Sequence, residues 1–162
     1  MSTITTLEAE LDKSEHQQAI LALLNAYAMD PMGDGKPLAD EVLQRLIPGL
    51  QAHPTTLVVL AFRGAEPVGM AICFRGFSTF AARPLLNIHD FVVLDQHRGH
   101  GIGRRVMDQV EAAARRLGCC KLTLEVQENN HRARVVYAAI GFKQSVHVAE
   151  AGGALFLSKS LQ

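Results

Sequence analysis

Three glycines alternate with other residues in the segment RGHGIGRR, which runs from Arg98 to Arg105. Glycine has no side chain to obstruct a ligand, so such a loop can point several backbone N–H groups into one concavity. An apolar stripe follows the loop and predicts a helix, whose N-terminus carries roughly half a positive charge. The chemistry that this combination favours is the binding of a diphosphate group.

Two common nucleotide-binding motifs do not match this loop. A dinucleotide fingerprint would need glycine at Arg104, and a Walker loop would end in Gly-Lys-Ser or Gly-Lys-Thr, which is absent. Arg104 and Arg105 oppose the dipole of the predicted helix, so a bound anion would explain their presence. For the loop taken alone, a tight glycine-rich connection without a ligand stays open as the alternative.

A second group of residues follows the loop in the pattern N-x-x-A-x-x-x-Y-x-x-x-G-F. Its members are Asn130, Ala133, Tyr137, Gly141 and Phe142. With R-x-x-G-x-G at Arg98, this order resembles the GCN5-related N-acetyltransferases (GNAT), whose acetyl-CoA loop reads Q/R-x-x-G-x-G/A. The resemblance covers about residues 57 to 160, and the motifs stand in the family's order.

The resemblance implies an α/β fold whose mixed, mostly antiparallel central sheet has splayed parallel middle strands and is flanked by helices. It implies acetyl-CoA as cosubstrate, with its pantetheine arm between the splayed strands, and no metal. Backbone groups of residues 91–93 would bond the pantetheine, and amides of residues 98–104 would hold the diphosphate. The residues that the family pattern assigns to acetyl-CoA are Phe91, Val92, Val93, Arg98, Gly99, His100, Gly101, Ile102, Gly103, Arg104, Asn130, Ala133 and Tyr137.

Acetyl transfer to an amine requires proton transfers. A primary amine with a pKa near 10.4 is neutral in only about one molecule in a thousand at physiological pH, so a base or a water relay is needed. The departing thiol gains from a proton donor, and the resemblance implies that Tyr137 is this acid. His89 and Asp90, in the strand before the loop, are the candidate bases. Side chains alternate across a strand, which predicts that these two face opposite sides.

The segment around His89 is also similar to the diamine acetyltransferase branch of the family. In that branch a Glu-Asp pair occupies this place, and the glutamate is the proposed base. His89 replaces the glutamate here, which weakens any inference to polyamine substrates. An imidazole with a pKa near 6.5 is a competent base, but a structural histidine hydrogen-bonded between strands is an equally open reading.

Hydrophobic periodicity predicts the elements that position these residues. Helices are expected near residues 20–27, 38–50, 102–117 and 133–140. Strands are expected at residues 57–62, 68–74, 88–94 and 121–126, with two closing strands around Gly152-Gly153 and a less regular segment at 75–87. The strand-helix-strand order across 88–126 predicts a parallel pair, and the first two strands form an antiparallel hairpin. Without repeats or linkers, residues 1–162 are expected to form one domain.

Composition narrows the class of protein. The 162 residues contain 16 Lys and Arg against 16 Asp and Glu, and this balance argues against a nucleic-acid or membrane-surface binder. The three cysteines show no metal-binding spacing, and an odd number favours a reducing compartment. The first residues lack the apolar core of a signal peptide, and no apolar run spans a bilayer, so a cytoplasmic protein is expected.

The leading hypothesis is an acetyl-CoA-dependent N-acetyltransferase that acts on a small primary amine by direct transfer, as a monomer or a homodimer. One alternative is acetylation of a protein N-terminus or a lysine side chain. Another is a catalytically silent acyl-CoA-binding sensor, against which the presence of Tyr137 argues.

Overall fold

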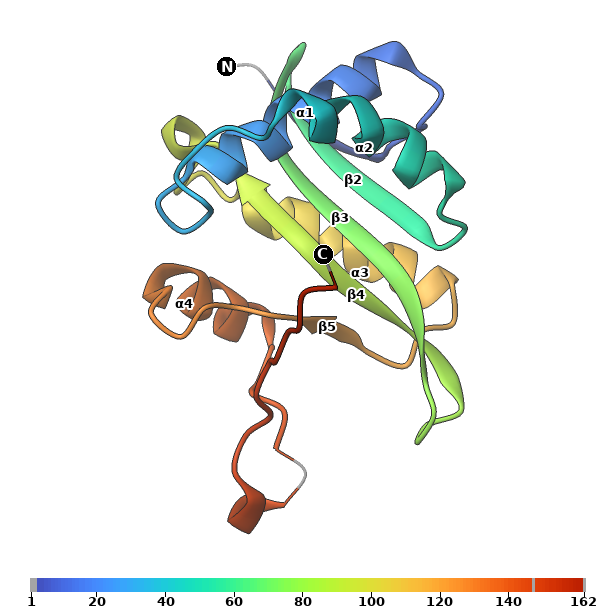
Figure 1. Cartoon of the computed structure of the whole chain (residues 1–162), viewed down its shortest axis with the longest axis vertical. Coiled ribbons are helices and arrows are strands. Elements are labelled where there is room, and N and C mark those ends of the chain that lie inside the picture. The colour runs from blue at the N-terminus through green and yellow to red at the C-terminus, as the bar shows by residue number, and fades with distance from the viewer. Residues whose placement is uncertain (1–2, 147, 162) are drawn as a thin grey trace. The chain divides into compact units, whose positions relative to one another are not determined.

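The computed structural model describes residues 3–146 and 148–161. Internal contacts divide the chain into two compact units, with the boundary between Leu124 and Glu125. The first unit holds a sheet with helices on both faces, and the second holds helix α4 and an irregular tail (Figure 1). That the whole chain forms one domain stays a prediction.

The described part of the chain forms a five-stranded sheet in the order β1-β2-β3-β4-β5. The strands are β1 (Ile4–Glu8), β2 (Thr56–Arg63), β3 (Glu66–Ser78), β4 (Arg83–Val93) and β5 (Leu122–Leu124). Neighbouring strands pair antiparallel except β4 and β5, which run parallel. The predicted α/β class, the mixed and mostly antiparallel sheet, and the parallel pair are confirmed.

Helices α1 (Ser14–Met29) and α2 (Asp40–Ala52) cover one face of this sheet, and α3 (Ile102–Arg116) covers the other (Figure 1). On the α1 side, Ile20 and Leu23 pack against Met70 and other fully buried strand residues. Burying each of these large aliphatic side chains contributes roughly 1.5–3 kcal/mol, which fixes α1 firmly on the strands that lead to the site.

Three expectations about the strands are wrong. Strand β1 was not predicted, because it is a five-residue edge strand with weak polar alternation. Residues 75–87 are not irregular but complete the long β3–β4 hairpin around a turn at 79–82. The described residues after Ile140 contain no strand, although one backbone hydrogen bond joins Ala154 N–H to the Ser145 oxygen at 3.3 Å.

The second unit is ordered around α4 (His131–Ile140). The side chain of Asn130 begins this helix by accepting a hydrogen bond from the Ala133 N–H at 3.1 Å. At its other end, Gly141 and Phe142 donate their N–H groups to the Tyr137 oxygen, so the helix ends in a Schellman turn. A short 3-10 turn, Ala149–Ala151, follows in the tail.

Candidate active site

Strand β4 contains a β-bulge at His89. Asp90 pairs with Ile72 and Ile88 pairs with Cys73, so β4 holds one residue more than β3 across this step. Ile72 belongs to the core under α1, and its partner Asp90 therefore faces α1 as well. The bulge turns His89 toward the same place, because its Nδ1 lies 3.1 Å from Asp90 Oδ2. The prediction that the two side chains face opposite sides is wrong, because the extra residue breaks the alternation.

The pair combines an accessible imidazole with a more sheltered carboxylate. The His89 side chain is 64% exposed and that of Asp90 is 22% exposed. The His89 ring also stands edge-on to Phe74, with 5.6 Å between ring centroids. A carboxylate can only accept, so in a neutral ring the proton lies on Nδ1 and Nε2 carries the free lone pair. This arrangement leaves Nε2 of an exposed imidazole able to accept a proton.

Tyr27, near the end of α1, adds a hydroxyl to this face of the sheet. Burial raises the pKa of Tyr27, and the negative charges of Asp90 and Asp30 raise it further. The hydroxyl therefore keeps its proton at neutral pH and can donate a hydrogen bond. Sequence reasoning missed Tyr27 because its place in the apolar stripe of a helix indicated only a core residue. The carboxylate of Asp90 beside a neutral donor favours a cation, whereas Arg98 balances the charge of Asp30.

Cys73 lies on β3 opposite Ile88, in the step that forms the bulge. Burial, with a smaller contribution from the charge of Asp90, raises the pKa of Cys73 to about 12. The thiolate, not the thiol, is the nucleophile, so Cys73 is inert at neutral pH. Cys73 is therefore not suited to act as a nucleophile.

The predicted diphosphate loop lies between strand β4 and helix α3. Gly99 and Gly101 have φ values of +79° and +75°, a conformation that residues with side chains rarely adopt. Helix α3 begins at Ile102 with no side-chain cap and no acidic residue in its first turn. The first N–H groups of a helix have no partner within it, so those of residues 102–104 are suited to an anion. The loop thus fits a diphosphate.

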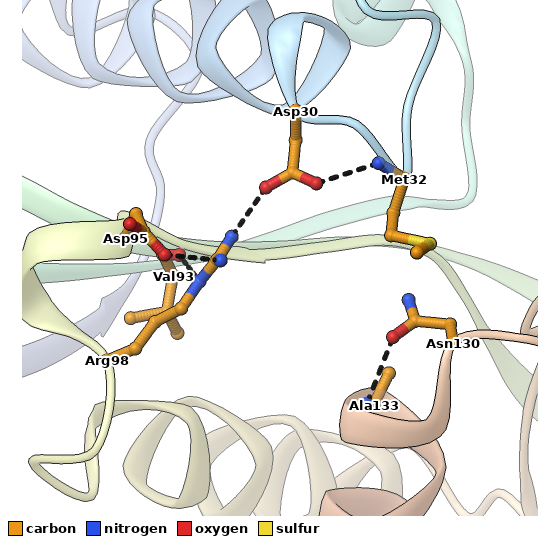
Figure 2. Close-up of polar contacts among 7 residues, drawn as sticks. All are labelled: Asp30, Met32, Val93, Asp95, Arg98, Asn130 and Ala133. Atoms are coloured by element: carbon orange, nitrogen blue, oxygen red, sulfur yellow. Dashed lines mark hydrogen bonds and ion pairs between the residues drawn. The ribbon is translucent and has the colours of Figure 1, made fainter.

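Arg98 is held entirely by protein groups. Its backbone N–H donates to the Asp95 oxygen, so the amides suited to an anion are those of residues 99–104. Its side chain donates to the Val93 oxygen, to Asp95 and to Asp30 (Figure 2). The two arginines that follow also have partners, because Arg104 pairs with Asp108 and Arg105 donates to the Ile4 oxygen. A bound anion is therefore not needed to explain them. His100 Nδ1 lies 3.3 Å from the His97 oxygen.

Beyond the bulge, β4 directs alternate backbone groups to opposite edges. The Leu94 N–H donates to the Val68 oxygen, so Val92, two residues earlier, also directs its backbone toward β3. Phe91 and Val93 then point toward the β5 edge, where the β4–β5 pairing stops at Ile88. Of the three residues predicted to bond pantetheine, Phe91 and Val93 therefore have the required direction.

Gly103 brings the first turn of α3 against this end of β4. A Cβ atom at Gly103 would lie 3.2 Å from Cζ of Phe91 and 3.7 Å from Cγ2 of Val93. The sequence predicts ligand approach at this glycine, and the structure adds close packing of helix on strand. The predicted diphosphate loop and the β4 groups predicted to bond pantetheine are therefore held together in the first unit.

The second motif has a clear local structure in the second unit. Asn130 and Ala133 form the start of α4 (Figure 2), and the buried Tyr137 ring packs edge-on to Phe142 with 5.9 Å between centroids. The Schellman turn at Gly141 places Phe142 on that ring. The roles of Asn130, Ala133 and Tyr137 toward acetyl-CoA stay predictions.

A metal-binding cluster and a membrane-spanning helix are both absent from the described residues. No group of three or more His, Cys, Asp or Glu side chains is arranged to hold a metal ion. Among the helices of residues 3–146 and 148–161, none has the length and apolar character needed to cross a membrane.

Comparison with known proteins adds an independent observation. The family model described as "Acetyltransferase (GNAT) family" matches residues 20–142. A thialysine N-epsilon-acetyltransferase from Bos taurus is 34% identical over 79 residues, 49% of this chain and 46% of that protein. Its counterpart from Mus musculus is 28% identical over 133 residues, 82% of this chain and 71% of that protein. The chain thus spans about half the length of the bovine relative.

A solved structure supports the fold. The crystal structure titled "a possible acetyltransferase from Clostridium difficile 630" superposes with a TM-score of 0.78 at 16% identity, covering 98% of this chain and 99% of that one. At this identity the likeness establishes the arrangement of the elements and leaves the substrate open.

Proposed function

The chain belongs to the GNAT acetyltransferase family, and we propose that it transfers the acetyl group of acetyl-CoA to the primary amine of a small molecule. The observation that carries this proposal is the continuity of β4. One strand presents the His89–Asp90 pair at its bulge, then the outward backbone groups of Phe91 and Val93, and then leads into the diphosphate loop.

His89 is the proposed base. Its Nε2 accepts a proton from the attacking amine as the nitrogen–carbon bond forms and the carbon–sulfur bond breaks. Asp90 holds the imidazole in the tautomer that leaves Nε2 free, through the contact at Nδ1. Tyr137 is the proposed acid, whose hydroxyl donates to the departing sulfur. An ammonium ion loses two protons in all, one before the attack and one as the amide forms, and His89 passes them to solvent. One proton from solvent restores the Tyr137 hydroxyl, so the products are an amide, the free thiol of CoA and one released proton.

The acceptor is proposed to be a small aliphatic amine that arrives as an ammonium ion. The charge of Asp90 beside the neutral Tyr27 hydroxyl supports a cationic acceptor, whereas Arg98 balances the charge of Asp30. The names of the bovine and mouse relatives specify an N-epsilon amine of thialysine, a lysine analogue, which is compatible with this class. Donor groups in the loop and on β4 fit acetyl-CoA, and no step of the proposed reaction uses a metal.

The cytoplasm is the proposed location, in line with three free cysteines. A homodimer is the proposed assembly. A mass in solution of twice 17.6 kDa is the expected result, and a mass of 17.6 kDa would contradict it. Neither proposal affects the chemistry assigned to β4.

An amine screen tests the function. The protein is incubated with acetyl-CoA and lysine, thialysine, short diamines, amino acids, or a peptide that carries a free N-terminus and lysines. Acetylated products are measured by mass spectrometry, because half-exposed Cys119 and Cys120 would react with a thiol reagent used to detect CoA. We expect the kcat/KM for acetylation of a small amine to exceed the kcat/KM for acetylation of the peptide. Faster acetylation of the peptide, or tight acetyl-CoA binding with no product, would overturn the small-amine proposal.

A further inference from the structure

The guanidinium group of Arg98 joins three separate segments of the first unit. Its Nε donates to the Val93 oxygen at 2.8 Å, its Nη1 to Asp95 Oδ1 at 2.7 Å, and its Nη2 to Asp30 Oδ2 at 2.8 Å (Figure 2). Val93 ends β4, Asp95 begins the turn into the diphosphate loop, and Asp30 follows α1. One side chain therefore connects the two parts that are proposed to bind acetyl-CoA with the end of the helix that carries Tyr27.

Asp30 is a fixed point of the chain and not a loose surface carboxylate. Its Oδ1 accepts a hydrogen bond from the Met32 N–H at 2.9 Å, and its backbone oxygen accepts from the Gly33 N–H at 2.8 Å. These bonds start the connection between α1 and α2, residues 30–39. We call it the acceptor segment, because it follows the end of α1 that carries Tyr27, where the proposed acceptor binds. Its far end is held where the Leu38 N–H donates to Asn25 Oδ1 at 2.9 Å.

The two ion pairs of Arg98 differ in exposure. The side chains of Arg98 and Asp30 are 25% and 20% exposed, whereas that of Asp95 is 82% exposed. Water screens an exposed pair strongly and a sheltered pair much less. The bond to Asp30 is therefore the one through which Arg98 holds a neighbouring segment, and the bond to Asp95 is the weaker, local one.

We propose that Arg98 and Asp30 are positioning residues that couple acetyl-CoA binding at the diphosphate loop to the ordering of the acceptor segment. The proposal rests on the proposed function, because it assigns acetyl-CoA to that loop. A ligand that fixes the loop and β4 also fixes Arg98 at its Nε, and Arg98 then holds Asp30 and the residues that follow. Coupling between sites is reciprocal, so an amine that orders the acceptor segment strengthens acetyl-CoA binding by the same factor.

Hydrogen exchange with CoA as the probe tests this coupling in the full chain. CoA is expected to slow exchange both at residues 99–104 and at residues 30–39 in the unaltered protein. In Asp30→Asn, which keeps the acceptor for the Met32 N–H but removes the charge, residues 99–104 stay protected. Protection of residues 30–39 by CoA falls by about fivefold or more, the lower end of typical coupling between sites.

Asp95→Asn is the matched control, because it makes the same chemical change at another carboxylate bound to the same arginine. It is expected to leave the CoA-induced protection of residues 30–39 intact. Arg98→Lys keeps the charge but cannot span three acceptors, so CoA should again protect residues 30–39 less than in the unaltered protein. This variant tests the coupling even if Asp30→Asn folds poorly.

The outcomes separate the two proposals. If CoA protects neither segment of the unaltered protein, the proposed function fails at its first step. The coupling is overturned if CoA protects residues 99–104 alone in the unaltered protein, or if residues 30–39 stay equally protected in Asp30→Asn. It is also overturned if Asp95→Asn loses as much protection as Asp30→Asn, since the sheltered pair would then have no special role.

Discussion

Removal of the His89 imidazole should affect catalysis far more than stability, because its contacts are few. They are the edge-on pair with the Phe74 ring, at 5.6 Å, and the bond to Asp90, at 3.1 Å. An aromatic pair contributes about 0.5–1.5 kcal/mol and a hydrogen bond a similar amount, and the exposure of this side chain favours the lower values. His89→Ala should therefore cost about 1–2 kcal/mol, out of a total of roughly 5–15 kcal/mol.

The loss in rate should be larger. Loss of a general base lowers turnover by roughly 100-fold or more, equivalent to about 2.7 kcal/mol in the transition state. The stability loss of about 1–2 kcal/mol lowers the Tm by only about 2–8 °C for a chain of this length, so the variant stays folded in an assay at room temperature. The deficit should shrink as the pH approaches the amine pKa near 10.4, because free amine then no longer requires a base. Acetylated product measured between neutral pH and about pH 10.4 gives both the loss in rate and its decrease with rising pH.

His53→Ala is the matched control. His53 follows α2 and contacts the same Phe74 ring, at 4.8 Å between centroids, so its removal causes a similar loss of packing. Its rate should stay within about threefold of the unaltered protein. Asp90→Asn keeps an acceptor for the Nδ1 proton, so its loss should be smaller than that of His89→Ala. An unchanged rate and pH profile in His89→Ala would refute the assignment, and a larger loss in Asp90→Asn would identify Asp90 as the base.

Three further predictions concern other parts of the site. Gly101→Val, at φ +75°, should cost about 1–2 kcal/mol and abolish the rise in Tm caused by acetyl-CoA, which a retained rise would contradict. Tyr137→Phe should lower kcat by roughly 10²–10⁴ with little change in acetyl-CoA affinity, and an unchanged kcat would show that no acid is required. Folded protein at pH 8 should react with a thiol reagent at Cys119 and Cys120 but not at Cys73, whose pKa burial raises from 9.0 to about 12. Because native Cys73 keeps a proton that the unfolded chain loses, stability should fall between these pH values, with a contribution from Cys73 of up to about 1.4 kcal/mol per pH unit. Cys73→Ala should reduce this slope, and the raised pKa of Tyr27 should leave a smaller one.

The parts of the fold that sequence could predict are those in which one residue pattern meets one structural demand. The stripe from Ile102 to Leu117 gave α3, and the alternating glycines before it gave a loop with two left-handed residues. The parallel pairing of β4 and β5 followed from the helix between them. In each case the relevant interactions are local, or the connection allows only one arrangement.

The features that sequence missed depend on partners far along the chain. The bulge at His89 exists only in the register between β3 and β4, and no local pattern marks it. Tyr27 gains its role from Asp90, which lies on another element. Arg98 was assigned to the loop by its motif position, but its side chain is directed by Asp30. Two closing strands around Gly152-Gly153 were expected from alternation alone. A strand also needs a neighbouring strand with which to pair, and the described residues there form none.

The bulge also explains how His89 and Asp90 meet although they are successive residues of one strand. In a regular ladder, the position opposite Ile72 would offer one side chain to the face under α1, and its neighbours would point away. The extra residue lets two successive side chains project to that face, so the proposed base and the group proposed to orient it come from one strand. Beyond Asp90 the alternation resumes, with Val92 in the core under α1 and Phe91 and Val93 against α3. The bulge therefore brings the two side chains together and leaves unchanged the direction of the Phe91 and Val93 backbone groups, because it adds only one residue to the strand.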